Sequence, residues 1–172
     1  MRILFGKKYR WCTALPAIAM GLMLILPIGN PALGAEGARH LVGTWQLVSW
    51  INKQADGSTD YPMGESPVGL LICDAHGNLS LQVMDDFRPT FESGYEQTSL
   101  EELKEVYKTY SAMFGAYTVD TTNRTIEIQV RGITNPNYLG STLTRYYDFG
   151  DSTLTLSLNK ERTNSTVWKK IK

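Results

Sequence analysis

Short segments of β-type residues recur along the chain beyond residue 40, and turn clusters separate them. The clusters lie at residues 56–58, 74–78, 121–124, 135–137 and 150–152. Short strands at such regular spacing are typical of an antiparallel meander, closed as a barrel or packed as a sandwich. The pattern predicts strands near residues 42–52, 59–63, 67–74, 78–85, 115–120, 124–132, 140–149, 152–158 and 164–171. The expected fold class is therefore all-β, in a single domain.

One segment, from Leu100 onward, breaks this pattern because its apolar residues recur at helical spacing. They are Leu100, Leu103, Val106, Tyr107, Tyr110, Met113 and Phe114. Thr98 with Glu101, and Ser99 with Glu102, both have the spacing of a capping box. The sequence predicts one amphipathic helix inserted into the meander, with its apolar stripe packed against the sheet. A lid over one end of a cavity is the alternative.

The first 35 residues have the three parts of an export signal. Four basic residues come first, an apolar run covers residues 11–28, and a stretch rich in small residues follows at 31–35. The pattern predicts a cleaved signal peptide at residues 1–35 and a mature domain at residues 36–172. The mature protein is then periplasmic or secreted, with no stable membrane span. An uncleaved anchor is the alternative, because the apolar run approaches the ~18 residues that can span a bilayer.

The composition of the expected mature domain excludes several classes of function. Cleavage would leave 13 basic and 17 acidic side chains, a net charge of −4, which argues against nucleic-acid binding. Only Cys73 would remain, within an apolar run, so we expect a buried thiol and no internal disulfide. One Cys and two His supply too few ligands to indicate a metal site. No cofactor is expected.

The first expected strand reads Gly-Thr-Trp-Gln-Leu-Val-Ser-Trp at residues 43–50. Since alternate residues of a strand point to opposite faces, Trp45 is expected on one face and Trp50 on the other. Gly43 lacks a side chain, so another segment can approach the backbone there while the Trp45 indole fills the base of a barrel.

The Gly43-x-Trp45 pattern on a first strand resembles the opening signature of lipocalins. Further motifs, in order, are similar to the lipocalin-like domain family of small bacterial and fungal proteins, over about residues 40–170. They are Tyr61-Pro-x-Gly64, Pro67-x-Gly69, Asp74-x-His-Gly77, Leu79-Ser-x-Gln82, Arg88-Pro89, Phe114-Gly-x-Tyr117, Asn135-Pro-Asn137, Arg145-Tyr146 and Gly150-Asp-x-Thr-Leu154.

The resemblance implies an antiparallel up-and-down lipocalin-like β-barrel with one inserted amphipathic α-helix, and it implies no particular activity. It also implies that a base from the stretch at residues 168–170 packs across Trp45, where lipocalins have an arginine. The chain departs from secreted lipocalins in two ways. Its helix lies in the middle of the barrel sequence, and it has one mature cysteine.

Arg145 interrupts an otherwise apolar face of its expected strand. Large apolar or aromatic residues flank it two positions away on both sides, so we expect it to point into an enclosed region. An unpaired guanidinium is costly there. A ligand could satisfy it, or a protein group could, such as Glu127, Asp148 or the face of Trp45. The structural role is the more general one for buried arginines.

A barrel of about eight to ten strands is either filled by side chains or holds one small ligand. The predicted ligand-binding residues are Gln82, Met84, Arg88, Phe114, Tyr117, Arg145, Tyr147 and Tyr61. Arg145 and Gln82 are expected to hold the polar end of an otherwise apolar ligand, and a carboxylate would suit the guanidinium fork. Arg88 lies in the loop before the helix, where pocket mouths occur; an exposed loop arginine is the alternative.

No nucleophile elbow, zinc-protease motif, phosphate-binding glycine loop or Cys/His pair occurs in the sequence. No catalytic residue is therefore predicted. The leading hypothesis is an exported protein that binds a small hydrophobic ligand in its barrel. The alternatives are a cofactor-independent cyclase- or isomerase-type enzyme that uses the same cavity, and a filled barrel that acts as a protein-interaction module.

Overall fold

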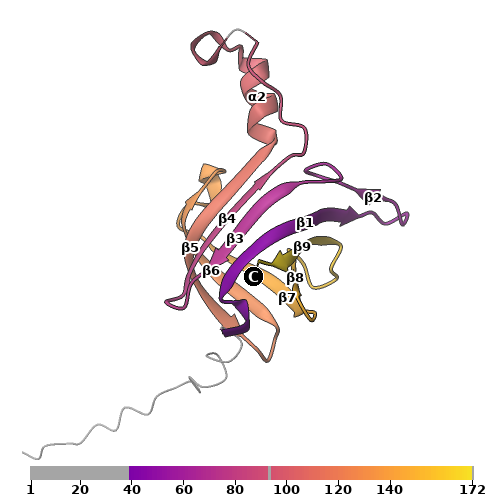
Figure 1. The fold of residues 1–172 in the computed structure, drawn as a ribbon, viewed down its shortest axis with the longest axis vertical. Coiled ribbons are helices and arrows are strands. Elements are labelled where there is room, and N and C mark those ends of the chain that lie inside the picture. The colour runs from indigo at the N-terminus through magenta and orange to yellow at the C-terminus, as the bar shows by residue number, and fades with distance from the viewer. Residues whose placement is uncertain (1–38, 93, 172) are drawn as a thin grey trace, which may run out of the picture.

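The computed structural model describes residues 39–92 and 94–171, which form one antiparallel sheet that closes on itself (Figure 1). The order in the sheet is β2-β1-β3-β4-β5-β6-β7-β8-β9, and an additional pairing of β1 with β9 closes the barrel. This confirms the predicted up-and-down barrel. The predicted signal peptide, at residues 1–35, lies outside the described residues.

The strands lie close to their predicted positions. They are β1 (Gly43–Lys53), β2 (Thr59–Asp60), β3 (Val68–Cys73), β4 (Asn78–Met84), β5 (Tyr110–Asp120), β6 (Thr125–Ile133), β7 (Thr142–Phe149), β8 (Thr153–Ser157) and β9 (Asn164–Lys170). The helical elements are η1 (Tyr95–Gln97), α2 (Leu100–Lys108) and η2 (Pro136–Tyr138). No helix in the described parts of the chain is long and apolar enough to cross a membrane.

Strict alternation of apolar and polar residues places the core inside the barrel. Ile126, Ile128 and Val130 of β6 and Leu154 and Leu156 of β8 are all buried. The β6 residues between them are exposed. Each fully buried aliphatic side chain of this kind stabilises the fold by about 1.5–3 kcal/mol.

Strand β1 departs from strict alternation at a β-bulge between Leu47 and Ser49, where its pairing with β9 shifts by one residue. Val48 is the extra residue and is half exposed. One extra residue reverses the facing of every residue that follows. Trp45 is buried as predicted, but Trp50 also turns inward and packs against the core. The prediction of one tryptophan on each face of β1 is therefore wrong.

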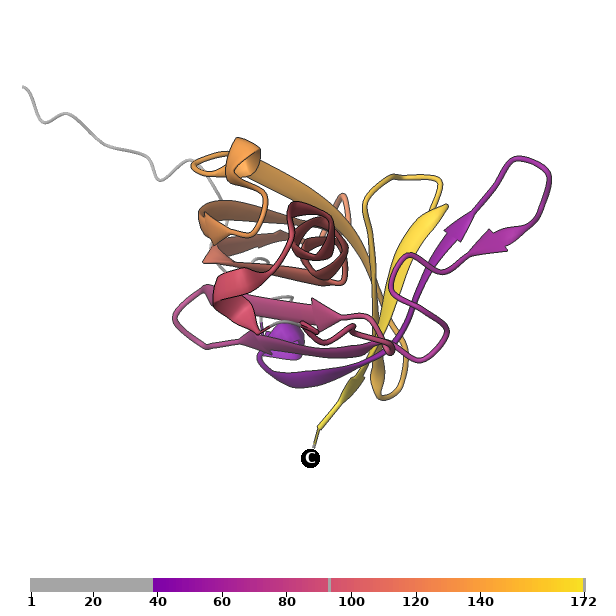
Figure 2. The ribbon, with the colours of Figure 1, turned by 90° about the horizontal axis from the view of Figure 1, so that it is seen from above.

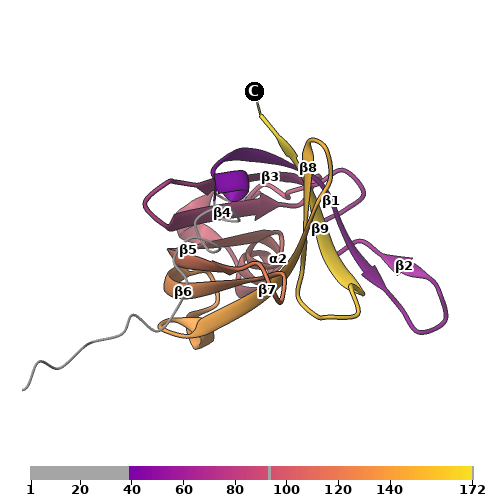
Figure 3. The same cartoon turned by 90° about the horizontal axis from the view of Figure 1, so that it is seen from below.

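The helical residues 39–41 lie at the end of the barrel opposite α2 (Figures 1 and 3). Leu41 and Trp45 are buried there and form what we call the closed end. The Trp45 Nε1–H donates a hydrogen bond to the Leu41 carbonyl at 2.9 Å. Lys170 Nζ lies 5.0 Å from the centroid of the Trp45 ring, which confirms that a base covers this indole. A Cβ at Gly43 would come within 2.8 Å of Lys170 Cε, so the close approach predicted at this glycine is that of Lys170.

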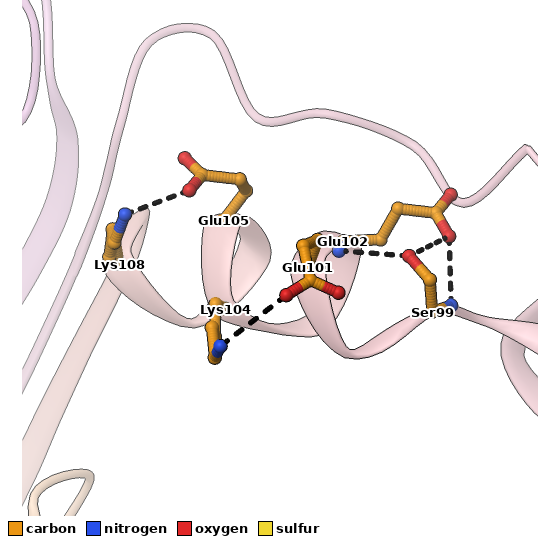
Figure 4. Close-up of polar contacts among 6 residues, drawn as sticks. All are labelled: Ser99, Glu101, Glu102, Lys104, Glu105 and Lys108. Atoms are coloured by element: carbon orange, nitrogen blue, oxygen red, sulfur yellow. Dashed lines mark hydrogen bonds and ion pairs between the residues drawn. The ribbon is translucent and has the colours of Figure 1, made fainter.

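Helix α2 begins at the predicted capping box. The Glu102 amide donates to Ser99 Oγ at 3.2 Å, and the Ser99 amide donates to the Glu102 carboxylate at 2.9 Å (Figure 4). The helix ends at Lys108, and β5 begins at Tyr110. The predicted extension of the helix to Phe114 is wrong, because backbone pairing with β4 overrides the apolar spacing there.

The apolar face of α2 does not pack against the barrel wall, contrary to the prediction. Leu100 is 61% exposed, Leu103 is 41% exposed and Tyr107 is 52% exposed. Figure 1 shows α2 standing beyond the end of the barrel as a continuation of β5. The Tyr107 hydroxyl donates to the Thr134 carbonyl at 3.0 Å, so the last turn of α2 contacts the segment that follows β6.

Strand β2 is shorter than predicted. It covers only Thr59 and Asp60, which pair with Lys53 and Asn52 at the end of β1. Figure 2 shows this hairpin extending to one side of the barrel. The closed wall is therefore built from β1 and β3 to β9.

Candidate functional site

The barrel contains a chamber of about 100 Å³. Its lining comes from β1, from β4 to β9 and from the residue that follows β8. The apolar lining residues are Leu79, Leu81, Val83, Met113, Ile128, Ile133, Leu156, Leu158 and Trp168. Five other lining residues carry polar side-chain atoms: Trp50, Ser111, Arg145, Asn164 and Thr166. The chamber thus combines apolar walls with a few polar groups, which is the usual composition of a small-molecule pocket.

A wider mouth of about 500 Å³ adjoins the chamber at the end of the barrel where α2 stands. Tyr107 and Lys108 of α2 line part of this mouth. Five residues line both spaces and form what we call the neck: Trp50, Ser111, Ile133, Arg145 and Leu158. A ligand that enters through the mouth must therefore pass these side chains to reach the chamber.

Arg145 of β7 points inward at the neck, as the sequence predicted. Its Nη1 donates to the Thr144 carbonyl at 2.9 Å, and no carboxylate of the described residues forms an ion pair with it. Asp148 pairs instead with two other arginines, at 3.2 and 3.0 Å, and Glu127 is exposed. Lys170 covers the tryptophan at the closed end. Burial lowers the pKa of the Arg145 guanidinium, as expected for a cation without a compensating acid.

Trp50 brings a second donor to the neck. Its Nε1 atom is buried and has no hydrogen-bond partner among the described residues. The other two described indoles are satisfied: Trp45 donates to the Leu41 carbonyl at 2.9 Å, and Trp168 donates to Thr166 Oγ1 at 2.8 Å. Buried polar groups without a partner are uncommon in folded proteins. At the neck, therefore, Arg145 lacks an acidic partner and Trp50 Nε1 lacks a hydrogen-bond partner among the described residues.

The cavity is electropositive in its lining. Among the described residues, no acidic side chain lines the chamber or the mouth, whereas Arg145 and Lys108 do. Lys108 is neutralised by Glu105 at 2.8 Å, so Arg145 supplies the uncompensated charge. Within residues 39–92 and 94–171, no group of three or more His, Cys, Asp or Glu residues is placed to hold a metal ion.

Three of the predicted ligand-binding residues lie on the outer surface of the barrel. Gln82 is exposed, Phe114 is 55% exposed, and Met84 is half-buried on the same outer face as Gln82. Inward-facing Val83 lies between Gln82 and Met84, so strand alternation decides their facing. The structure does not bring Gln82 together with Arg145.

Two predicted tyrosines are buried in the core and line neither the chamber nor the mouth. The Tyr117 hydroxyl donates to the Asp74 carbonyl at 2.9 Å, and burial raises the pKa of Tyr117 to about 12. The Tyr147 ring packs against Phe149 with 5.2 Å between centroids, and burial also raises the pKa of Tyr147. Both side chains have protein partners.

The last two predicted residues lie in loops. Tyr61 follows β2 and is 42% exposed, and Arg88 follows β4 with its guanidinium 5.2 Å from the centroid of the Tyr110 ring. Neither residue lines the chamber or the mouth. The placement of Arg88 matches the exposed loop arginine that the sequence left open.

Of the predicted ligand-binding residues, the structure thus places Arg145 alone in the cavity lining. Trp50 and Ser111 were not among the ligand-binding residues predicted from the sequence. The inward alternation of β5 offered a signal for Ser111, which lies two positions before Met113. No local signal marked Trp50, because its facing depends on the bulge.

The chain was compared with known proteins. The family model of the lipocalin-like domain matches residues 42–171. Among solved structures, a lipocalin-like protein from Bacteroides uniformis is similar, with 18% sequence identity and a TM-score of 0.42. The match covers 76% of this chain and 98% of that one. The comparison with curated proteins gives no match.

Proposed function

The chain belongs to the lipocalin-like domain family, and from this premise we propose that it binds and carries a small hydrophobic molecule inside its barrel. The position of Arg145 supports this most directly. Its guanidinium lies between an apolar chamber and a wider mouth and has no carboxylate partner among the described residues. A few well-placed polar groups orient a ligand among apolar walls. Arg145 holds the polar end of the ligand.

The two ends of the barrel support one route of entry. Leu41 and Trp45 are buried at the closed end, while the mouth opens beside α2. Tyr107 lines the mouth and is hydrogen-bonded to the Thr134 carbonyl, so the last turn of α2 borders the opening. The ligand enters past α2 and reaches the neck. The chamber favours this function over the filled barrel considered from the sequence.

Native mass spectrometry of protein purified without detergent tests the proposal, followed by denaturing extraction of bound molecules. We expect a stoichiometric apolar adduct on the wild type and its loss in Arg145→Met, which removes the charge and keeps an extended apolar side chain. Arg131→Met is the matched control, because Arg131 is exposed on a neighbouring strand. It should retain the adduct.

Three outcomes would change the proposal. Equal adduct on both variants would contradict the role of Arg145. A protein that stays free of adduct after incubation with a library of lipids and metabolites would contradict the carrier function. Chemical conversion of the bound molecule would favour the enzyme alternative.

We also propose that the protein acts outside the cytoplasm after residues 1–35 are removed. The basic start, apolar run and small residues of this segment support export. Expression of the full chain with N-terminal sequencing of the product tests this, and the expected first residue is at or next to Glu36. An intact N-terminus on protein that stays in the cytoplasmic fraction would contradict export.

A further inference from the structure

We propose, building on the carrier function proposed above, that the neck selects molecules that end in a carboxylate. Trp50 is the second recognition donor beside Arg145. The ligand is then an amphipathic monocarboxylate, with its anionic end at the neck and its apolar tail in the chamber.

The chemistry of the two donors determines this class. A guanidinium and an indole N–H can donate hydrogen bonds and cannot accept them. Arg145 and Trp50 both line the chamber and the mouth, so both side chains border the neck. A carboxylate has two acceptor oxygens and a negative charge, and it therefore satisfies both donors and compensates the guanidinium. A hydroxyl leaves the charge uncompensated, and an ammonium is repelled.

Two other polar residues of the chamber, Thr166 and Asn164, are already engaged within the protein. The Thr166 hydroxyl donates to the Leu156 carbonyl at 3.2 Å and accepts from Trp168 Nε1 at 2.8 Å. The Asn164 amide donates to the Asn52 side chain. Such engaged groups offer little to a ligand, whereas Trp50 Nε1 has no partner among the described residues. An indole N–H left in this state is stabilised when a ligand acceptor arrives.

The lining below the neck determines where the tail goes. The chamber is walled by residues such as Leu79, Val83 and Ile128, with no acid among the described residues that line it. An alkyl chain gains from leaving water for such a surface. A medium-length, water-soluble tail is therefore the simplest probe.

The test uses octanoate, octanol and octylamine, which share one tail and differ in the end group. Full-length protein labelled with ¹⁵N-tryptophan is titrated with each probe, and the indole N–H resonances are followed by NMR. We expect octanoate to shift the Trp50 resonance and to bind at least about tenfold more tightly than the other two probes. The Trp45 and Trp168 indoles already have partners and should move less.

The variant Trp50→Phe keeps an aromatic ring and removes the donor. It identifies the Trp50 resonance, and it should weaken octanoate binding about tenfold and octanol binding less, because a neutral hydroxyl is the weaker acceptor. Unchanged Trp45 and Trp168 resonances in the free variant show that the barrel is intact.

The outcomes separate this inference from the carrier function. Equal affinity for all three probes would overturn carboxylate selection and leave an apolar carrier. Octanoate binding that does not shift the Trp50 resonance, or that Trp50→Phe does not weaken, would overturn the role of Trp50. Failure of all three probes to bind would also overturn the inference, and the adduct seen by native mass spectrometry would then decide whether the carrier function survives.

Discussion

Trp45 and Trp50 lie on the same strand and both face the interior, yet they belong to opposite ends of the barrel. Trp45 is 2% exposed, and its N–H is bonded to the Leu41 carbonyl. Trp50 is only partly buried, and its buried Nε1 has no partner among the described residues. The same residue type therefore has a satisfied donor at one end and, beside the cavity at the other, a donor without a partner among the described residues.

The cations Lys170 and Arg145 differ in the same way as the two tryptophans. Lys170 covers the Trp45 ring at 5.0 Å and completes the closed end. Arg145 lies at the neck without an acidic partner among the described residues, and burial lowers its pKa. The Trp45 donor at the closed end is satisfied, whereas Trp50 Nε1 at the neck has no partner among the described residues. A half-buried charge without an acidic partner does not stabilise the fold, so the arrangement at the neck adds nothing to stability.

The largest effect should separate the two tryptophans. Trp45→Ala should lower the free energy of unfolding by about 3–5 kcal/mol, because it removes a fully buried indole and leaves a buried carbonyl unpaired. Trp50→Ala should cost about 1–2 kcal/mol, because the indole is half-buried beside an existing cavity. Urea denaturation measures both values. Equal losses of stability in the two variants would contradict this difference between the two ends of the barrel.

A second effect should appear only in alkaline solution. Burial raises the pKa of Cys73 and of Tyr117, each to about 12. The folded protein therefore keeps protons that the unfolded chain releases above the ordinary values of 9.0 and 10.0. Stability is fully present below about pH 9 and is lost as pH rises from there towards 12.

Tyr117→Phe tests this alkaline loss. It should cost about 1 kcal/mol at pH 7, through the bond to the Asp74 carbonyl, and it should make the alkaline loss shallower. Urea unfolding at pH 7, 9 and 11 gives both quantities. Tyr61→Phe is the matched control at an exposed tyrosine and should change neither. An equally steep loss in Tyr117→Phe would show that this hydroxyl does not contribute.

The two cations should respond in opposite directions. Arg145→Met should raise the free energy of unfolding by about 1 kcal/mol, because it replaces a half-buried charge that lacks an acidic partner with an apolar side chain. Lys170→Met should lower it by about 0.5–1 kcal/mol, through the lost interaction with the Trp45 ring. Thermal and urea unfolding measure both. A loss of stability in Arg145→Met would mean that the guanidinium has a structural partner.

Local patterns were enough to predict the antiparallel meander, and the resemblance to the lipocalin-like domain family implied its closure as a barrel. The alternation of Ile126, Ile128 and Val130 defines one inward face without reference to the rest of the chain. The turn at residues 74–78 is equally local, because the Asp74 carboxylate accepts from the amides of His76 and Asn78, both at 2.8 Å. Features of this kind involve residues close in sequence, and they can be read from the sequence.

The lining of the cavity was harder to predict, because pairing between strands far apart in the sequence decides which side chains face inward. Arg145 could be found, since a charged residue interrupts an apolar face. Gln82 and Phe114 were chosen for their chemical type, and strand alternation turned both outward. Trp50 depends on the bulge at Val48, where pairing with a strand more than a hundred residues away shifts by one residue. No residue near Val48 in the sequence indicates that shift in pairing.

The smallest effects should arise in α2, which the fold holds at the open end. Its ion pairs, Glu101 with Lys104 at 3.5 Å and Glu105 with Lys108 at 2.8 Å, are exposed (Figure 4), so each contributes about 0–0.5 kcal/mol. Leu103→Ser should change the free energy of unfolding by less than about 0.5 kcal/mol.

The matched substitution in the barrel is Leu154→Ser, at a leucine that is fully buried, and it should cost about 3 kcal/mol or more. Urea denaturation of both variants compares the two sites directly. If Leu103→Ser proved as costly as Leu154→Ser, α2 would have to pack against the barrel in solution. A small cost at Leu103 means instead that its apolar face adds little to the stability of the fold, because folding of the barrel does not bury it. The apolar face of α2 and the donors of the neck then have one property in common, because folding alone leaves both unsatisfied.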